Sequence, residues 1–295
     1  MSRLLPERLL PDFLFPGFFL PNWARDQLRI FLGPQHISLL SLNSRASRIR
    51  AKRTVTCNAT RCGEAPWRNA LATLETALPE FSQRKRRVTV ILSNHFVRYA
   101  LIEHGNEVTN ANEENALLRH SFMQIYGDRA DRWLFRLADT NKRDAPRLAC
   151  AMDRKLQEYL DALFKQSKLT LHSIQPYFMT AFNQWRHRFK GAAWFVVVEQ
   201  ARLCLAGFHN HRWHCIKSIA ISDDWFRDLS LQLERERFLS GNETENIPVF
   251  ICAPGYDTEP LPAQVQGCTV EILRAARAAN VATEAQDTRA MALTG

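Results

Sequence analysis

The polar residues best suited to chemistry follow a strand-like segment, RVTVIL at residues 87–92. Ser93, Asn94, His95 and Arg98 come directly after it, at the end of a strand where open α/β sheets usually bind ligands. A hydroxyl beside an imidazole suggests nucleophilic catalysis. Near neighbours in sequence cannot place the two groups as a nucleophile elbow does, however, and the chain contains no G-x-S-x-G. Two hypotheses remain: structural hydrogen bonds at the strand end, or a partner-binding site formed by Asn94, His95 and Arg98.

Histidine and cysteine patterns do not favour a metal site. His209, His211 and His214 lie in FHNHRWHC, where a hairpin tip would not present three ligands on one face, so we interpret the segment as a polar turn. Cys57 and Cys62 have no matching ligands downstream. The seven cysteines include no C-x-x-C pair, which is typical of buried thiols in a reducing compartment. We therefore expect no bound metal.

Length and composition indicate a globular protein with room for two domains, since 46% of its 295 residues are hydrophobic. The net charge is +9 and the isoelectric point is about 9.4. The basic residues are scattered, so we interpret them as solvated faces and strand-edge protection. Among binding functions, an anionic lipid surface is favoured over nucleic acid. The sequence shows no secretory signal and no uncharged apolar window of about 18 residues, so we expect no membrane span.

The first 26 residues differ from the rest of the chain. Prolines recur every five residues and break any helix longer than about one turn, while leucine, phenylalanine and tryptophan fill the spaces between them. This composition is too apolar for a free tail. We predict either an extended arm packed on the folded body or an arm that binds a membrane interface or a partner.

Alternation and helical spacing predict the remaining elements. Strands are expected at 28–32, 37–42, 49–56, 87–92, 133–137, 148–152, 169–174, 194–198, 201–208, 213–221 and 247–252. Helices are expected at 66–78, 113–126, 153–166, 176–189 and 224–239. Asp153 is the expected N-cap of the third helix.

These elements form an internal repeat, which decides the architecture. GPQHISLLSL at Gly33 aligns with EQARLCLAGF at Glu199, APWRNAL at Ala65 with DDWFRDL at Asp223, and RVTVIL with NIPVFI at Asn246. Both copies therefore have the order βββαβ.

Two βββαβα copies in one chain resemble the actin-like ATPase fold, in which two ribonuclease-H-like halves face each other across a cleft. Within that superfamily the chain resembles the cytoplasmic actin-like proteins of type IV pilus assembly and type II secretion, of the PilM, MshI and GspL type. LSNHFVRYALI at residues 92–102 and the aromatic second meander carry this resemblance. It implies a first half at 27–168 and a second half at 169–274, and the composition of the two ends predicts an N-terminal arm at 1–26 and a flexible tail at 275–295.

The resemblance also implies where a nucleotide would bind, because actin-like ATPases hold phosphates in one hairpin turn of each half. In the first turn Leu32 replaces the expected aspartate. Gly33 is present, Pro34 removes one N–H donor, and Gln35 completes the turn. We therefore expect weakened phosphate binding in the first half.

The second turn departs from the family pattern as well. It contains the acid Glu199 and Gln200, but neither a glycine nor a hydroxyl residue. Gly255, in Ala-Pro-Gly after the last strand of the second copy, lies where the fold usually receives adenosine, although the same residues form ordinary turns. Mg-ATP binding at these residues remains an alternative to a chain without a cofactor.

The resemblance favours a non-catalytic scaffold at the inner-membrane platform of a type IV pilus or type II secretion system. It would be cytoplasmic or peripheral to the inner membrane, and would bind a short cytoplasmic peptide of a membrane-anchored assembly protein. The alternative is an ATP-binding enzyme of the sugar-kinase or ATPase type, for which Asp139, Asp153 and Asp223 are candidate acids by position only.

Overall fold

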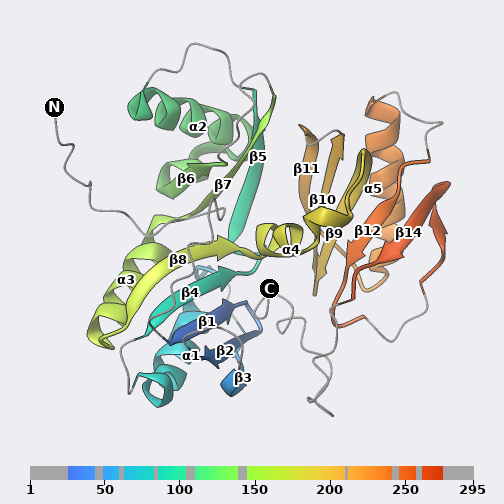
Figure 1. Ribbon diagram of the computed structural model, residues 1–295. Coiled ribbons are helices and arrows are strands. Elements are labelled where there is room, and N and C mark those ends of the chain that lie inside the picture. Colours follow the sequence, from blue (N-terminus) through green and yellow to red (C-terminus); the bar gives the residue numbers. More distant parts are fainter. Residues whose placement is uncertain are drawn as a thin grey trace, which may run out of the picture. The chain divides into compact units, whose positions relative to one another are not determined.

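The computed structural model describes residues 26–43, 49–59, 63–82, 86–103, 110–138, 145–209, 212–240, 246–256 and 261–274. The chain divides into two compact units (Figure 1). The first unit lies within Met1–Phe96 and Asp153–Pro176, and the second within Val97–Met152 and Tyr177–Gly295. The predicted arm, apart from Asp26, and the predicted tail lie outside the described residues.

The first unit is built on a five-stranded sheet in which an antiparallel meander is extended by parallel strands. In spatial order its strands are β3 (Ile49–Thr56), β2 (His36–Leu42), β1 (Gln27–Leu32), β4 (Arg87–Leu92) and β8 (Thr170–Pro176). The parallel pairing of β1 with β4 brings their carboxyl ends together, and Ser93 N donates to Leu32 O at 2.9 Å. The predicted turn at Gly33 and the polar residues after β4 therefore start from neighbouring strand ends.

Two helices complete the first unit, α1 (Arg68–Ala77) and α3 (Arg154–Gln166). Their buried residues recur at helical spacing, as the sequence predicts, with Leu156, Leu160 and Phe164 on α3. The α1 segment ends earlier than predicted and continues as a 3-10 turn, η1 (Leu78–Phe81), because Pro79 lacks the N–H that a further α-helical turn needs. The predicted cap at Asp153 is confirmed, since its side chain accepts from Lys155 N.

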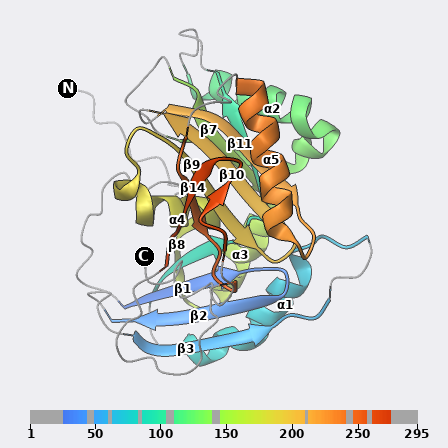
Figure 2. The ribbon, with the colours of Figure 1, turned by 90° about the vertical axis from the view of Figure 1, so that its right-hand side faces the viewer.

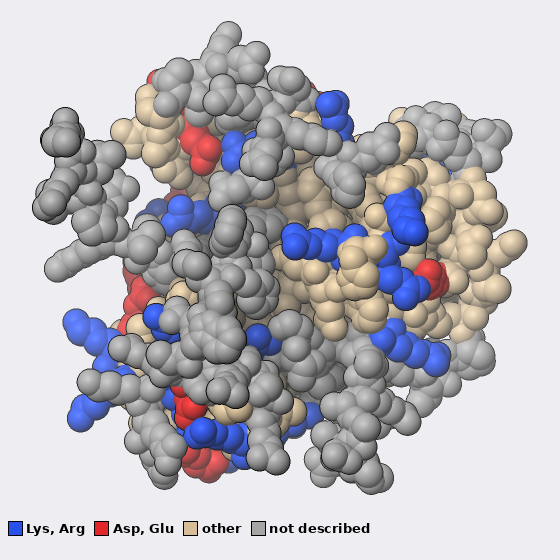
Figure 3. Space-filling view, in the orientation of Figure 1, with Lys and Arg blue, Asp and Glu red and all other residues tan. Residues whose placement is uncertain are grey.

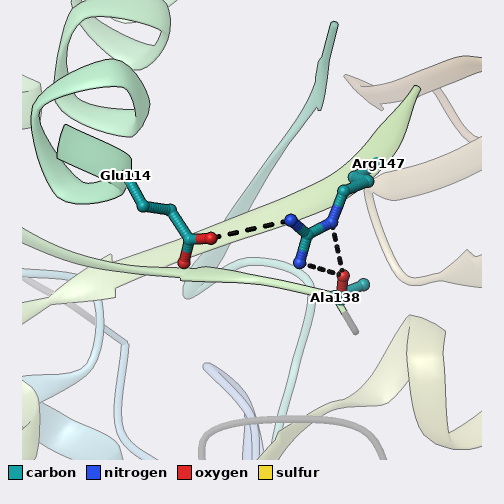
Figure 4. Close-up of polar contacts among 3 residues, drawn as sticks. All are labelled: Glu114, Ala138 and Arg147. Atoms are coloured by element: carbon teal, nitrogen blue, oxygen red, sulfur yellow. Dashed lines mark hydrogen bonds and ion pairs between the residues drawn. The ribbon is translucent and has the colours of Figure 1, made fainter. Parts of the chain in front are cut away.

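Residues 97–152 form a small three-stranded sheet within the second unit. The strand order is β5 (Val97–Ile102), β7 (Arg147–Asp153) and β6 (Trp133–Leu137), with α2 (Ala111–Tyr126) followed by a 3-10 turn, η2 (Gly127–Arg132). Small side chains on β5 and β7 leave room for Phe122 of α2 in the core. Figure 4 shows the polar tie between these elements: Arg147 donates twice to Ala138 O, at 2.9 and 3.0 Å, and lies 3.6 Å from Glu114 of α2.

The larger sheet of the second unit repeats the strand arrangement of the five-stranded sheet in the first unit. Three antiparallel strands are followed by a strand parallel to the first of them, in the order of the predicted repeat. The spatial order is β11 (Arg212–Ala220), β10 (Arg202–His209), β9 (Ala192–Glu199), β12 (Val249–Cys252), β14 (Cys268–Ile272) and β13 (Gln264–Val265). The last two strands were not predicted from the sequence.

Different helices cover the two faces of this sheet. One face packs on α5 (Trp225–Ser240), with Trp194, Leu203 and Leu229 in its core, and Figure 2 shows α5 along this sheet. Strand residues of opposite parity point to the other face. There α4 (Tyr177–Trp185) and Phe189, which follows the 3-10 turn η3 (Arg186–Arg188), contribute to an aromatic cluster, formed by Phe178, Phe182, Phe189, Phe195, Phe208, Trp213 and Phe250.

A buried carboxylate holds α5 to the edge of the sheet. Glu236 accepts from Cys215 Sγ of β11 at 3.1 Å and from Gln232 Nε2 at 2.8 Å, and Lys217 Nζ lies 3.9 Å away. Burial and the neighbouring carboxylate raise the pKa of Cys215, so the thiol stays protonated and can donate. These contacts give Glu236 a structural role.

Candidate functional site

The first predicted phosphate turn is a tight β1–β2 hairpin whose backbone groups bond within the turn and to the residue after β3. Gly33 N donates to His36 O at 3.1 Å, and Gln35 O accepts from Cys57 N at 2.6 Å. A Cβ on Gly33 would lie 2.7 Å from Cε1 of Phe31, whose ring stacks on His36. Close packing against Phe31 therefore explains why a glycine stands at position 33, and phosphate binding by Gly33 and Gln35 stays a prediction.

The second predicted phosphate turn joins β9 to β10 through Gln200 and Ala201. Glu199 and Arg202 form the last cross-strand pair before the turn. Ala201 has φ 57°, in the left-handed region that favours glycine, so its side chain costs about 1 kcal/mol relative to glycine. Glu199 is only 8% exposed, which makes it a buried carboxylate at the end of a strand.

Gly255 lies in a turn whose geometry follows from the local sequence. Tyr256 N donates to Ala253 O at 3.1 Å across Pro254 and Gly255, and Gly255 has φ 110°. Proline at the second position of a turn and glycine at the third are typical of type II, which requires the positive φ. The turn thus has a local explanation, and adenosine binding at Gly255 remains a prediction.

The polar residues after β4 form a compact turn. Phe96 N donates to Ser93 O at 2.9 Å, and His95 N donates to Ser93 Oγ at 3.2 Å. The recorded contact between Ser93 Oγ and His95 is therefore to the main chain, and Ser93 and Asn94 are fully buried. Asn94 and His95 belong to the first unit, whereas Arg98 belongs to β5 of the second.

A cluster of charged residues in the second unit surrounds the thiol of Cys204. The pKa of Cys204 is raised to about 12, first by burial and also by the negative charge of Glu199. The hydrogen bond with Ser218 and the positive charges of Arg202 and Arg98 lower this pKa. Burial is the main cause that lowers the pKa of Arg98, and the positive charge of Arg202 lowers it further. The two guanidinium groups therefore lie close enough to repel each other. The structure thus brings Glu199 of the predicted nucleotide site near Arg98 of the predicted partner site.

Arg202 is the member of this cluster that the sequence reasoning missed. Its signal is a charged residue in a strand whose next six residues are apolar, directly after a hairpin turn. Arg202 Nη1 donates to Ser218 Oγ of β11 at 3.2 Å. Its Nε is buried and has no hydrogen-bond partner among the residues that the structure describes.

A shallow pocket of about 250 Å³ lies in the first unit, between β3 and α1. Asparagine, threonine and arginine line much of it, in a set comprising Arg53, Val55, Asn58, Asn69, Ala72, Thr73, Thr76 and Ala77. Asn69 Nδ2 donates to Ala59 O at 2.8 Å, and Arg53 pairs with Glu80, so polar groups around this pocket already have partners in the chain. No feature of the sequence singled out this pocket.

The candidate acids of the enzyme hypothesis do not form a site in the described structure. Asp153 Oδ1 accepts from Lys155 N at 2.9 Å and its Oδ2 accepts from Trp67 Nε1 at 3.2 Å, so the carboxylate is used in structural bonds. Asp223 is exposed, and Asp139 lies outside the described residues. His211 lies outside them too. Within the described ranges no group of three His, Cys, Asp or Glu side chains is placed to hold a metal.

Basic side chains are numerous on the surface of the second unit. Arg186 and Lys190 are exposed on and just after η3, and Arg188 of η3 pairs with Glu271 of β14. Figure 3 shows Lys and Arg side chains gathered over this part of the chain. Across the residues with a described structure, no helix has the length and apolar character that crossing a membrane requires.

Comparisons with known proteins give structural neighbours only. The sequence matches no protein-family model, and it matches no curated protein. A chain of the PilM-PilN type IV pilus biogenesis complex superposes with a TM-score of 0.64 at 12% identity, covering 84% of this chain and 88% of that one. The cytoplasmic domain of Epsl, an inner membrane component of the type II secretion system of Vibrio cholerae, gives 0.51 at 14% identity over 85% and 86%.

A third neighbour names the fold. It is a Bacteroides thetaiotaomicron protein of unknown function with an actin-like ATPase fold, and it gives a TM-score of 0.57 at 10% identity over 87% of this chain and 93% of that one. The two sheets of this chain repeat the same βββαβ order, which agrees with the match. The chain therefore has the actin-like ATPase fold, and its structure resembles those of the PilM-PilN and Epsl chains.

Proposed function

We propose that this chain is a non-catalytic actin-like scaffold of the inner-membrane platform of a type IV pilus or type II secretion system. In this role it binds the short cytoplasmic tail of a membrane-anchored partner. The observation that carries the proposal is the match to the PilM-PilN chain, which extends over most of both chains and comes from a complex of two proteins. The Epsl match supports the same setting, because that protein belongs to an inner-membrane machine.

The local structure of the two hairpin turns supports a binding role over catalysis. In the first turn, Pro34 has no N–H and the N–H of Gly33 is used by His36. In the second, Ala201 stands where the backbone favours glycine. Asp153, one of the candidate acids, is used as a helix cap and as the acceptor for Trp67.

The proposed location is the cytoplasmic face of the inner membrane. Exposed basic residues such as Arg186 and Lys190 would favour approach to an anionic lipid surface, with each basic residue near the surface contributing about 1 kcal/mol. The apolar segment 1–26 is a further candidate for contact with the membrane or the partner.

The second candidate function is an ATP-binding enzyme on the same fold. It is favoured by one observation: both hairpins that this fold uses for phosphates are formed at Gly33–Gln35 and Glu199–Gln200. In this case Mg-ATP would be the cofactor, and the reaction would be phosphoryl transfer or hydrolysis.

Peptide binding to the purified chain tests the proposal. Fluorescently labelled peptides would be made from the cytoplasmic tails of the membrane-anchored proteins encoded beside this chain's gene, with scrambled peptides as controls. We expect one tail to bind saturably and its scrambled form not to bind, as followed by fluorescence anisotropy. Phosphate release from Mg-ATP is measured in parallel. Turnover of ATP together with no tail binding would replace the scaffold with the enzyme.

A further inference from the structure

We propose that the outer face of α5 is an interface between two copies of this chain, which pair with their α5 helices antiparallel. Four residues at helical spacing form this face, and we call them the α5 stripe: Arg227, Leu231, Glu234 and Phe238. All four side chains are exposed. The proposal goes beyond the proposed function, because pairing at this face does not involve the tail of another protein.

Contacts within the second unit fix which side of α5 faces outward. Leu229 is fully buried in the core beneath the helix. Close to that core, Glu236 accepts from Cys215 Sγ at 3.1 Å. On one flank of the helix, Gln266 Nε2 donates to Ser230 Oγ at 2.9 Å, which ties α5 to the turn between β13 and β14. The helix therefore cannot turn the α5 stripe inward; Figure 2 shows α5 along one face of its sheet.

Large apolar side chains are concentrated on the outside of this helix. Among the described residues, three of the six large apolar side chains that are exposed belong to α5: Leu231 at 55%, Phe238 at 72% and Leu239 at 65%. Single exposed apolar residues are common on soluble proteins, whereas several on one helix are typical of a surface that another protein covers.

The internal repeat indicates that the fold itself does not require these apolar residues. Trp67 aligns with Trp225, which places the polar Thr73 of α1 where α5 has Leu231. The helix α1 has 10 residues, whereas α5 has 16. Phe238 lies in the added turns and is largely exposed. The apolar outer face is therefore a property of α5 and not of the repeated unit.

The charges of the α5 stripe fit a second copy of the same stripe. Arg227 lies about 6 Å before Leu231 along the helix axis and Glu234 about 4.5 Å after it, at a rise of about 1.5 Å per residue. When two α5 helices run antiparallel with their Leu231 side chains in contact, Arg227 of each copy lies beside Glu234 of the other. One twofold axis thus forms two pairs of opposite charge around one apolar contact.

Phe238 extends the apolar contact beyond these charge pairs. In the antiparallel arrangement it reaches the first turn of α5 in the second copy, because α5 begins six residues before Leu231 and Phe238 lies seven residues after it. A single pair of helices buries less than the roughly 1,600 Å² of a standard interface, so we expect a weak dimer.

The mixed charge of the α5 stripe favours a second copy over an anionic surface. Glu234 lies between the two apolar residues of the stripe, Leu231 and Phe238. A membrane of acidic lipids, or an acidic peptide, would bring negative charge next to this carboxylate and be repelled by it. A second copy instead supplies Arg227 to Glu234.

Sedimentation velocity of the full chain tests the interface. The chain is measured over about 5–500 µM at one ionic strength, a range suited to a weak interface. We expect a monomer that becomes a dimer as the concentration rises. Leu231→Asp should keep the chain monomeric over the whole range. Ile125→Asp is the matched control, because Ile125 is an exposed apolar residue on α2, outside the stripe, and this variant should dimerise normally.

Charge exchange tests the antiparallel pairing itself. Arg227→Glu and Glu234→Arg each turn both opposite-charge pairs into like-charge pairs, so each should weaken the dimer by about tenfold. The double variant, with both changes, forms opposite-charge pairs again and should recover the affinity of the wild-type chain. A folding defect in a single variant would not be corrected in this way, so recovery identifies the contact between the two copies.

The possible outcomes separate this interface from the proposed function. A monomer at every concentration would overturn the dimer, and so would a dimer that Leu231→Asp leaves unchanged or a double variant as weak as the single ones. A dimer with the expected variant effects stands even if no tail binds. If the wild-type chain is monomeric and Leu231→Asp abolishes tail binding, the α5 stripe binds the tail and the dimer is wrong.

Discussion

Asp153 accepts two hydrogen bonds that link helices α3 and α1 of the first unit. Substitutions at this residue allow the contribution of each bond to the free energy of unfolding to be measured separately. Its Oδ1 caps α3 by accepting from Lys155 N, and its Oδ2 accepts from Trp67 Nε1 next to α1. Trp67 is 4% exposed and packs on Tyr159 of α3 with ring centroids 5.6 Å apart. Asp153→Ala therefore removes a helix cap and also leaves a buried indole N–H without its acceptor.

The expected loss follows from adding these two contributions. Losing the cap costs about 1 kcal/mol of the free energy of unfolding. Leaving the buried indole N–H unsatisfied costs about 1–3 kcal/mol more. Asp153→Ala should thus destabilise the first unit by about 2–4 kcal/mol. In a Trp67→Phe background the donor is already absent, so the same change should cost only about 1 kcal/mol, the cap alone.

Urea denaturation followed by far-UV circular dichroism measures these differences, and native-state hydrogen exchange of α1 and α3 assigns them to the first unit. Asp153→Ser is the matched control, because serine caps a helix but is too short to replace the bond to Trp67. The reasoning is refuted if Asp153→Ala costs the same with and without the Trp67 indole.

Three further predictions concern single residues. Lys168 ends α3 in the left-handed conformation, with φ 56° and Leu169 N bonded to Phe164 O, so Lys168→Gly should raise the free energy of unfolding by about 1 kcal/mol; a lower urea midpoint would contradict this. The backbone N–H and the hydroxyl of Ser222 both donate to Asp228 and lower its pKa. Their contribution is present above the ordinary aspartate pKa and is lost as pH falls through the lowered value, so Asp228→Asn should be less stable at pH 7 and equal in acid; a difference that does not change with pH would be evidence against it. Burial raises the pKa of Cys204 to about 12, so iodoacetamide at pH 8 should alkylate it only after denaturation, and rapid alkylation of the native chain would show the thiol to be accessible.

Most of the fold could be predicted because its signals are local. Each long strand has an apolar run and each amphipathic helix has a stripe at helical spacing, and the order of these elements repeats. The Asp153 cap was predictable for the same reason, since it depends on residues two positions apart. The actin-like fold followed from the repeat and is confirmed by the structural neighbours.

The features that sequence missed depend on distant contacts or on short segments. β13 and β14 contain two and five residues, with Glu271 exposed enough to pair with Arg188, so neither shows a clear alternating pattern. The charged groups around Cys204 come from β5 and β10, which are far apart in the sequence, and nothing near Arg98 in the sequence indicates Arg202. The roles of Asn94, His95 and the two hairpin turns remain predictions, because their function depends on a ligand.

Deletion of the gene in its native host tests the central claim most directly. Surface pili are counted by electron microscopy, and secreted proteins are quantified in the culture medium, with and without a plasmid copy of the wild-type gene. The scaffold account predicts that one of these two outputs is lost on deletion and restored by the plasmid. Normal pili and normal secretion in the deletion strain would contradict it.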